Sequence, residues 1–227
     1  MRGRAGACRY RAGVLAEPAP ALSDLALGLI VVVLAVRLGR SPVAHRYWRT
    51  SFWWAGAAAL AGFVHHGVVK HSERWTGPSW AVISAMVVIA VSYLLAATVA
   101  EVLGPRHQRT FWALRSIGIA AYVVLAVTGH AGVNALLACE SLTMISIIAL
   151  WARAARRRHP MAGAVIVALV ADGAAAATKA IDPAITQRVA LDPTSLYHLA
   201  QISGMVLLYA AVSTPRRPDP EPRALAG

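Results

Sequence analysis

The chain has 227 residues, of which 58% are hydrophobic and only 14% are charged. That balance is more apolar than in ordinary globular proteins, so the composition indicates a protein whose solvent is a lipid bilayer. Lys and Arg number 22, whereas Asp and Glu number 10. In a soluble protein this excess would suggest nucleic acid, but here the cations lie in short loops between apolar segments. We therefore expect membrane lipid as the partner and no nucleic acid.

Seven apolar segments follow one another along the chain, most of them near the ~20 residues that a membrane-spanning helix needs. They are apolar throughout and lack the two-residue alternation of barrel strands. The predicted fold is therefore all-α, an integral membrane bundle of seven transmembrane helices. We expect a basic N-terminal tail at 1–21, the helical domain at 22–213 and a disordered C-terminal tail at 214–227. The predicted spans are 22–38, 51–69, 79–103, 110–128, 131–152, 161–178 and 194–213.

The distribution of cations predicts how the spans are oriented. Numbering the spans in order places 14 of the 22 Lys and Arg residues, Arg115 among them, at one membrane face. The positive-inside rule then puts the N-terminus outside and the C-terminus in the cytoplasm. The expected location is the plasma membrane.

Alternating the direction of the spans also assigns a depth to each polar residue. Four histidines, from the ends of the second and fourth spans and the start of the seventh, fall at one membrane level. They are His65, His66, His130 and His198. Adjacent helical residues point about 100° apart, so only one of the first two can face the bundle core squarely. We expect this to be His66, which continues the small-residue stripe of Gly62, Ala59 and Ala55, and we expect His65 to meet the lipid headgroups.

Three acidic residues lie in the predicted spans. Asp24 opens the first span at the level of the histidines, Glu140 lies in the fifth span and Asp172 in the sixth. An ionisable group at a helix centre costs roughly 2.5–3.5 kcal/mol on insertion scales, so it usually faces the bundle interior and has a partner. Structural explanations also exist: Asp24 is consistent with a helix cap beside Ser23, and the others with buried hydrogen bonds or, for Asp172, a pair with Lys179.

Imidazoles and carboxylates at one depth predict either a metal site or a proton-transfer chain, because both use the same groups. A zinc site would take His66, His198 and one further ligand. The candidates for that ligand are His130, which is also consistent with a plain turn, Glu140, Asp172 and Asp24. The helical HExxH motif is absent, and every ligand would come from a different span.

Two short stretches carry a resemblance to a known family: GFVHHG at 62–67 and TSLYHLAQISG at 194–204. With seven spans, they resemble the superfamily of alkaline ceramidases, progestin and adipoQ receptors and GPI-anchor-remodelling lipases. The resemblance implies a membrane hydrolase with a zinc ion on His66 and His198. The sequence departs from the family pattern at Thr194, where a second histidine is expected, and at Gly62, where a serine is expected. Its third span has no aspartate.

These observations favour a metal-dependent membrane hydrolase that cleaves the amide or ester bond of a lipid. The expected site has His66, His198 and His130 as zinc ligands, Asp24 and Glu140 as catalytic carboxylates, and Asp172 and Thr194 beside the histidines. Two other classes of protein would use the same residues. One is a proton- or ligand-coupled transporter or sensor, in which Asp172 and Lys179 would matter most, and the other is a non-catalytic subunit of a membrane complex.

Overall fold

The fold is described from a computed structural model. It covers residues 14–41, 46–104, 106–125, 127–128, 133–180, 182 and 192–214. In these ranges the chain forms seven α-helices and two short 3-10 helices, without strands, and this confirms the all-α prediction. The α-helices are α1 (Pro18–Gly39), α2 (Arg46–Gly67), α3 (Glu73–Val102), α4 (Gln108–Leu125), α5 (Val133–Arg156), α6 (Ala162–Ala177) and α8 (Pro193–Ser213). The 3-10 helices are η1 (Val69–His71) and η3 (Thr178–Ala180).

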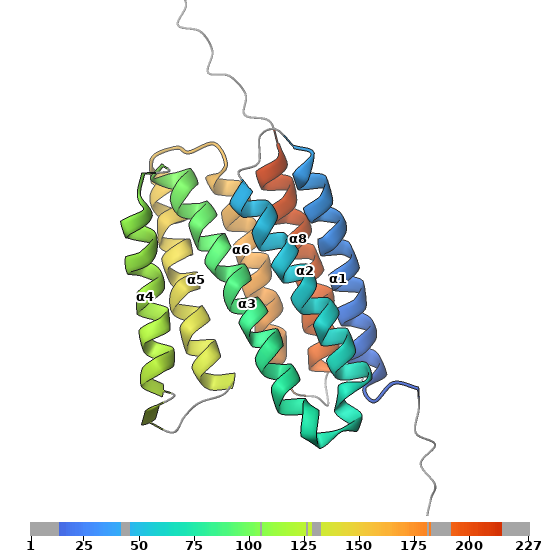
Figure 1. Cartoon of the computed structure of the whole chain (residues 1–227). Helices are drawn as coiled ribbons and strands as arrows, with labels where there is room; N and C mark the ends of the chain where they lie inside the picture. The colour runs from blue at the N-terminus through green and yellow to red at the C-terminus, as the bar shows by residue number, and fades with distance from the viewer. Residues whose placement is uncertain are drawn as a thin grey trace, which may run out of the picture.

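Successive α-helices run in alternating directions along one bundle (Figure 1). Spatial neighbours follow the order α1, α2, α3, α5, α6 and α8, and α8 packs back on α1, which closes a ring. Helix α4 lies outside this ring, against α5 and α3. The first and the last helix of the described chain are therefore adjacent.

Five helices are long and apolar enough to cross a membrane: α1, α2, α3, α5 and α8. Helix α6 is apolar but has only 16 residues, and α4 has 18. Large apolar side chains such as Leu29, Val33, Ile145 and Val170 are exposed on the outside of the bundle. The exposure of so many apolar side chains is unfavourable in water and favourable in lipid, as expected for a membrane protein.

Glycines allow α1 and α2 to approach closely. A Cβ atom at Gly28 would lie 2.7 Å from Leu60 Cδ2, and one at Gly56 would lie 2.8 Å from Val32 Cγ2. A larger residue at either position would push the two helices apart. Small residues at helix contacts are the usual basis of packing in membranes, where the hydrophobic effect does not drive helices together.

A tryptophan core holds the end of the bundle at which α2 begins and α5 ends. Trp48 and Trp151 are completely buried, and their ring centroids lie 6.4 Å apart. The indole Nε1 of Trp151 donates a hydrogen bond to Thr98 Oγ1 at 3.1 Å, which ties α5 to α3. The polar groups shared between α1, α2 and α8 lie at the opposite end.

Two sequence-based expectations are corrected by the fold. Arg115, counted above among the cations of the loops, is 1% exposed and lies inside α4. The first helix starts at Pro18, four residues before the predicted start, and its N-terminal boundary residue is Glu17. Asp24 is therefore in the second turn of α1, where its side chain is buried, and is not a helix cap.

Candidate functional site

The site is a cluster of ionisable side chains from α1, α2 and α8. Asp24 is 5% exposed and His198 is 7% exposed, so both are buried between the helices. His198 Nδ1 lies 3.3 Å from Asp24 Oδ1, and His66 Nε2 lies 3.9 Å from Asp24 Oδ2. One carboxylate is thus shared between two imidazoles. The depth argument placed these three residues at one level together with four further ionisable residues, and the structure brings these three into contact.

A serine on α1 completes the surroundings of His198. The hydroxyl of Ser23 donates to the carbonyl oxygen of Pro20 at 2.9 Å, and its oxygen lies 3.1 Å from His198 Nδ1. With its hydrogen used in this way, the hydroxyl accepts from the imidazole, so the hydrogen bonds favour the tautomer with a proton on Nδ1. That tautomer leaves Nε2 of His198 with a free lone pair.

His66 is held in a similar way by Glu17, the residue before α1. Its Nδ1 forms a hydrogen bond with Glu17 Oε2, and Lys70 Nζ lies 3.3 Å from Glu17 Oε1. The chain before α1 is fixed there because the Glu17 N–H donates to the His66 carbonyl at 3.0 Å. Partial burial would raise the pKa of Glu17, but the hydrogen bond from His66 and the charge of Lys70 lower it overall. Glu17 therefore stays ionised beside the imidazole.

Glu17 is the functional residue that the sequence analysis missed, because it falls in the predicted tail. The available signal was Pro18. Proline is favoured in the first turn of a helix, so the Glu17-Pro18 pair marks a helix start earlier than the hydropathy does.

Gly62 on α2 faces the carboxylate of Asp24. A Cβ atom at this position would lie 2.5 Å from Asp24 Oδ2 and 2.8 Å from its Cγ. The carboxylate of Asp24 therefore fills the space that a side chain at position 62 would need.

His65 is buried between helices and is not open to the lipid headgroups as expected. It is 2% exposed and points toward α3, where its Nδ1 lies 3.2 Å from Ser79 Oγ and its ring lies 5.7 Å from that of Trp80. The reason is that α2 packs on both α1 and α3. The small-residue stripe identified only the first of these two contact faces.

Glu140 lies in a different part of the bundle, on α5. Its Oε1 accepts from Arg115 NH2 of α4 at 3.0 Å. The same guanidinium donates to Thr143 Oγ1 at 2.7 Å and to the carbonyl oxygen of Val88 on α3 at 3.2 Å. The structure thus gives Glu140 a buried ion pair that fastens α4 to the ring, and it does not bring this carboxylate to the histidines.

Asp172 also lies apart from the two histidines, with its carboxylate against Gly204 of α8. A Cβ atom at Gly204 would overlap Asp172 Oδ1, and this oxygen has no hydrogen-bond partner among the described residues. The pair between Asp172 and Lys179 that the sequence suggested is not formed. The Lys179 ammonium instead lies 4.6 Å from the centroid of the Tyr197 ring. Glu17 and Asp24, rather than Asp172, are the carboxylates that orient the histidines.

The remaining predicted site residues are Thr194 and His130. Thr194 lies in the first turn of α8, where its N–H donates to Asp192 Oδ1 at 2.9 Å. It thus takes part in the start of α8, one turn before His198. His130 lies outside the described residues.

Asp192 caps the helix that carries His198, and its removal is predicted to weaken the site. Its carboxylate accepts from the N–H groups of Thr194 and Ser195 and from the Ser195 hydroxyl. We expect Asp192→Ala to lower the free energy of unfolding by about 1–2 kcal/mol. Asp192→Asn should keep most of the stability of the wild type, because asparagine also caps helices. Thermal unfolding of the full chain in detergent at pH 7 measures both. If Asp192→Ala and Asp192→Asn were equally stable, the side chain of Asp192 would not be acting as a helix cap.

The same cap predicts a dependence on pH. Partial burial would raise the pKa of Asp192, but the hydrogen bonds from Ser195 and Thr194 lower it overall. A carboxyl whose pKa is lower in the folded chain stabilises the fold above its unfolded value and loses this effect as the pH falls through the lowered value. The difference in stability between the wild type and Asp192→Ala should therefore shrink as the pH falls below the ordinary pKa of an aspartate, which the same unfolding measurement can follow.

The donor atoms of the cluster meet some of the requirements of a zinc site and not others. Histidines that bind metals usually donate their other ring N–H to a carboxylate or a carbonyl oxygen, and both histidines here have such a carboxylate. In the described part of the chain, however, no three His, Cys, Asp or Glu side chains are gathered around one point. The donor types and their orienting partners fit zinc, whereas the separation of His66 Nε2 and Asp24 Oδ2 is wider than the ~3.3 Å between two ligands of one tetrahedral zinc ion.

Comparison with known proteins places the chain in a family. The profile of DUF6962, a family of unknown function, matches residues 19–217. The chain belongs to this family. The DUF6962 match begins in the first turn of α1 and ends just beyond α8, so Asp24, His66 and His198 all lie within it. Comparisons with curated proteins and with solved structures find no match.

Proposed function

We propose that this chain is an integral-membrane hydrolase that cleaves an amide or ester bond of a membrane lipid. The supporting observation is that two carboxylate–histidine pairs, Glu17 with His66 and Asp24 with His198, meet at one end of three adjacent helices. Each pair orients an imidazole and leaves its Nε2 to act as a base or a ligand. The site lies at the end of the bundle, where the headgroup and the first carbons of a lipid would be.

All seven α-helices are spans in this proposal. Helix α6 is short but lies within the ring between two long helices, and α4 runs beside α5 and α3. The end at which α2 begins and α5 ends carries most of the arginines in the described part of the chain, so it faces the cytoplasm under the positive-inside rule. The cluster then lies at the outer face of the plasma membrane, with the N-terminus outside.

Zinc remains part of the proposal, with His66 and His198 as ligands. Asp24 supplies the third ligand or the base, and Glu17 holds His66 in position. A zinc ion bound there would lower the pKa of water and polarise the carbonyl of a lipid. The chain itself supplies the two fixed imidazoles, the buried carboxylate between them and the shielding of the site from bulk water.

Metal analysis of the purified full chain tests the role of zinc. We expect about one zinc ion per chain in the wild type and a loss of at least about tenfold in His66→Ala and His198→Ala, the size typical for removal of a metal-site residue. His65→Ala is the matched control, because this neighbouring imidazole faces Ser79 and should be replaced without loss of zinc. A wild-type protein without stoichiometric zinc would exclude the metalloenzyme.

Turnover of a panel of lipid amides and esters tests the hydrolase itself. The wild type should release fatty acid, and the His198→Ala variant should not.

The same contacts favour one other function, because Glu17, His66, Asp24 and His198 form a continuous chain from a partly exposed to a buried carboxylate. Such a chain could relay protons in a transporter or sensor. Binding or uptake that depends on pH without release of fatty acid would identify it.

A further inference from the structure

A second site lies at the opposite end of the bundle, between the start of α2, the second half of α3 and the start of α4. It is a crevice with a volume of about 670 Å³, within the ~300–1,000 Å³ that small-molecule sites usually have. Helix α4 packs more extensively on α5 than on α3, and the crevice lies on its α3 side. None of the residues of the Asp24 cluster lines it.

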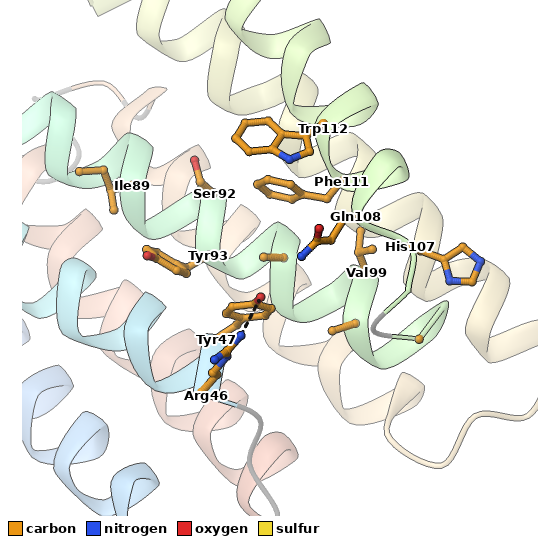
Figure 2. Close-up of a pocket in the computed structure, with 13 residues that line it drawn as sticks. Arg46, Tyr47, Ile89, Ser92, Tyr93, Val99, His107, Gln108, Phe111 and Trp112 are labelled. Carbon is orange, nitrogen blue, oxygen red and sulfur yellow. Dashed lines mark hydrogen bonds between the residues drawn. The ribbon is translucent and has the colours of Figure 1, made fainter.

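The walls of the crevice are apolar and aromatic. Figure 2 shows the rings of Tyr47, Tyr93, Phe111 and Trp112 around one space. Phe111 and Trp112 pack edge to face with ring centroids 5.0 Å apart, and Trp112 is 61% exposed. A surface of this kind, at the depth of the last turns of α3, suits a hydrocarbon chain that enters from the bilayer.

The end of the crevice nearest the arginine-rich face is polar. Arg46, His107 and Gln108 line it. The Arg46 guanidinium contacts Tyr47, with NH2 donating to the phenol oxygen at 3.4 Å and the guanidinium carbon 5.1 Å from the ring centroid. Among the described side chains no carboxylate forms an ion pair with Arg46. The crevice therefore combines an apolar interior with one uncompensated positive charge at its mouth.

We propose that this crevice binds a phospholipid with an anionic headgroup. One acyl chain lies between α3 and α4 along Ile89 and Phe111, and the phosphate contacts Arg46. Arginine suits this role because its planar guanidinium matches a phosphate with two parallel hydrogen bonds. Basic pockets between membrane helices on the cytoplasmic side are the usual sites for anionic headgroups. The bound lipid would fill the gap that the chain leaves between α3 and α4.

Lipid binding to the full chain in neutral detergent tests this site, by native mass spectrometry with phosphatidylglycerol and phosphatidylcholine of identical acyl chains. We expect phosphatidylglycerol to bind about fivefold more tightly, the effect of roughly 1 kcal/mol per basic residue near an anionic headgroup. Arg46→Gln should abolish this preference. Arg49→Gln is the matched control, because Arg49 lies on the same helix but lines a separate shallow crevice between α1 and α2.

A second variant tests the acyl-chain part of the site. Ala96 lies on the α3 wall, so Ala96→Phe should fill the crevice and weaken the binding of both lipids by about tenfold, the effect of roughly 1–2 kcal/mol from lost apolar contact. Equal binding of the two lipids by the wild type would overturn the proposal. So would equal loss of preference in Arg46→Gln and Arg49→Gln. Neither outcome depends on the Asp24 cluster, so the hydrolase proposal is tested separately.

Discussion

Replacing Arg115 by leucine is expected to lower the free energy of unfolding by about 3–5 kcal/mol, the cost of leaving one partner of a buried ion pair without the other. The guanidinium joins α4 to Glu140 and Thr143 of α5 and to the Val88 carbonyl of α3. Its removal leaves the Glu140 carboxylate buried against hydrocarbon. Because α4 lies outside the ring, it should separate from α5 first. Unfolding of the full chain in detergent micelles, followed by circular dichroism, measures the loss.

The double variant Arg115→Leu/Glu140→Leu is the control for this experiment. Replacing both partners removes the unpaired charge, so most of the lost stability should return. If Arg115→Leu alone were as stable as the wild type, the ion pair would not be what fastens α4. If the double variant were no more stable than the single one, the loss of stability would come from packing rather than from the unpaired carboxylate.

The second large effect is expected at Gly62, where alanine should disrupt the cluster. The new Cβ would lie 2.5 Å from Asp24 Oδ2, so the carboxylate must leave its place between His66 and His198. Overpacking of this kind costs about 1–3 kcal/mol. We expect Gly62→Ala to lower the rate of lipid hydrolysis and the amount of bound zinc by at least about tenfold. Loss of a carboxylate that orients a metal-binding histidine typically lowers metal affinity or activity by about 10–100-fold.

Gly173→Ala provides the matched control on another helix. A Cβ atom at Gly173 meets nothing within 4 Å, so this change has no steric consequence. It should leave hydrolysis unchanged and raise stability by up to ~1 kcal/mol, because alanine favours a helix over glycine. The contradictory result would be a Gly62→Ala protein with wild-type zinc content and turnover, since the position of Asp24 would then not matter.

The sequence was sufficient to predict the helices and the common membrane level of three residues. The predicted and observed helices coincide within a few residues, because long apolar runs are set by hydrophobicity alone. The alternation of direction, which needs only the order of the spans, placed Asp24, His66 and His198 at one level, but it placed four further ionisable residues there as well. The largest differences are at the starts of the first three helices, which begin four to six residues before the predicted spans.

What the sequence could not supply was the rotation of each helix and the pairing across helices. His65 was placed among the headgroups because one small-residue stripe was identified, whereas α2 has two contact faces. Glu140 was assigned to the site from its depth in the fifth span, while its partner Arg115 was counted as a loop cation. A basic residue within the fourth predicted span could have indicated a buried pair, but only the structure places it beside α5.

The adjacency of α1 and α8 has a consequence for how the protein matures. Ser23 and His198 are 175 positions apart, yet they lie in contact. Membrane helices enter the bilayer in the order of their synthesis, so Asp24 and His66 are in place long before the helix that carries His198 emerges. The cluster is completed only when the last described helix has docked. A chain interrupted anywhere before α8 would lack His198 and therefore this site.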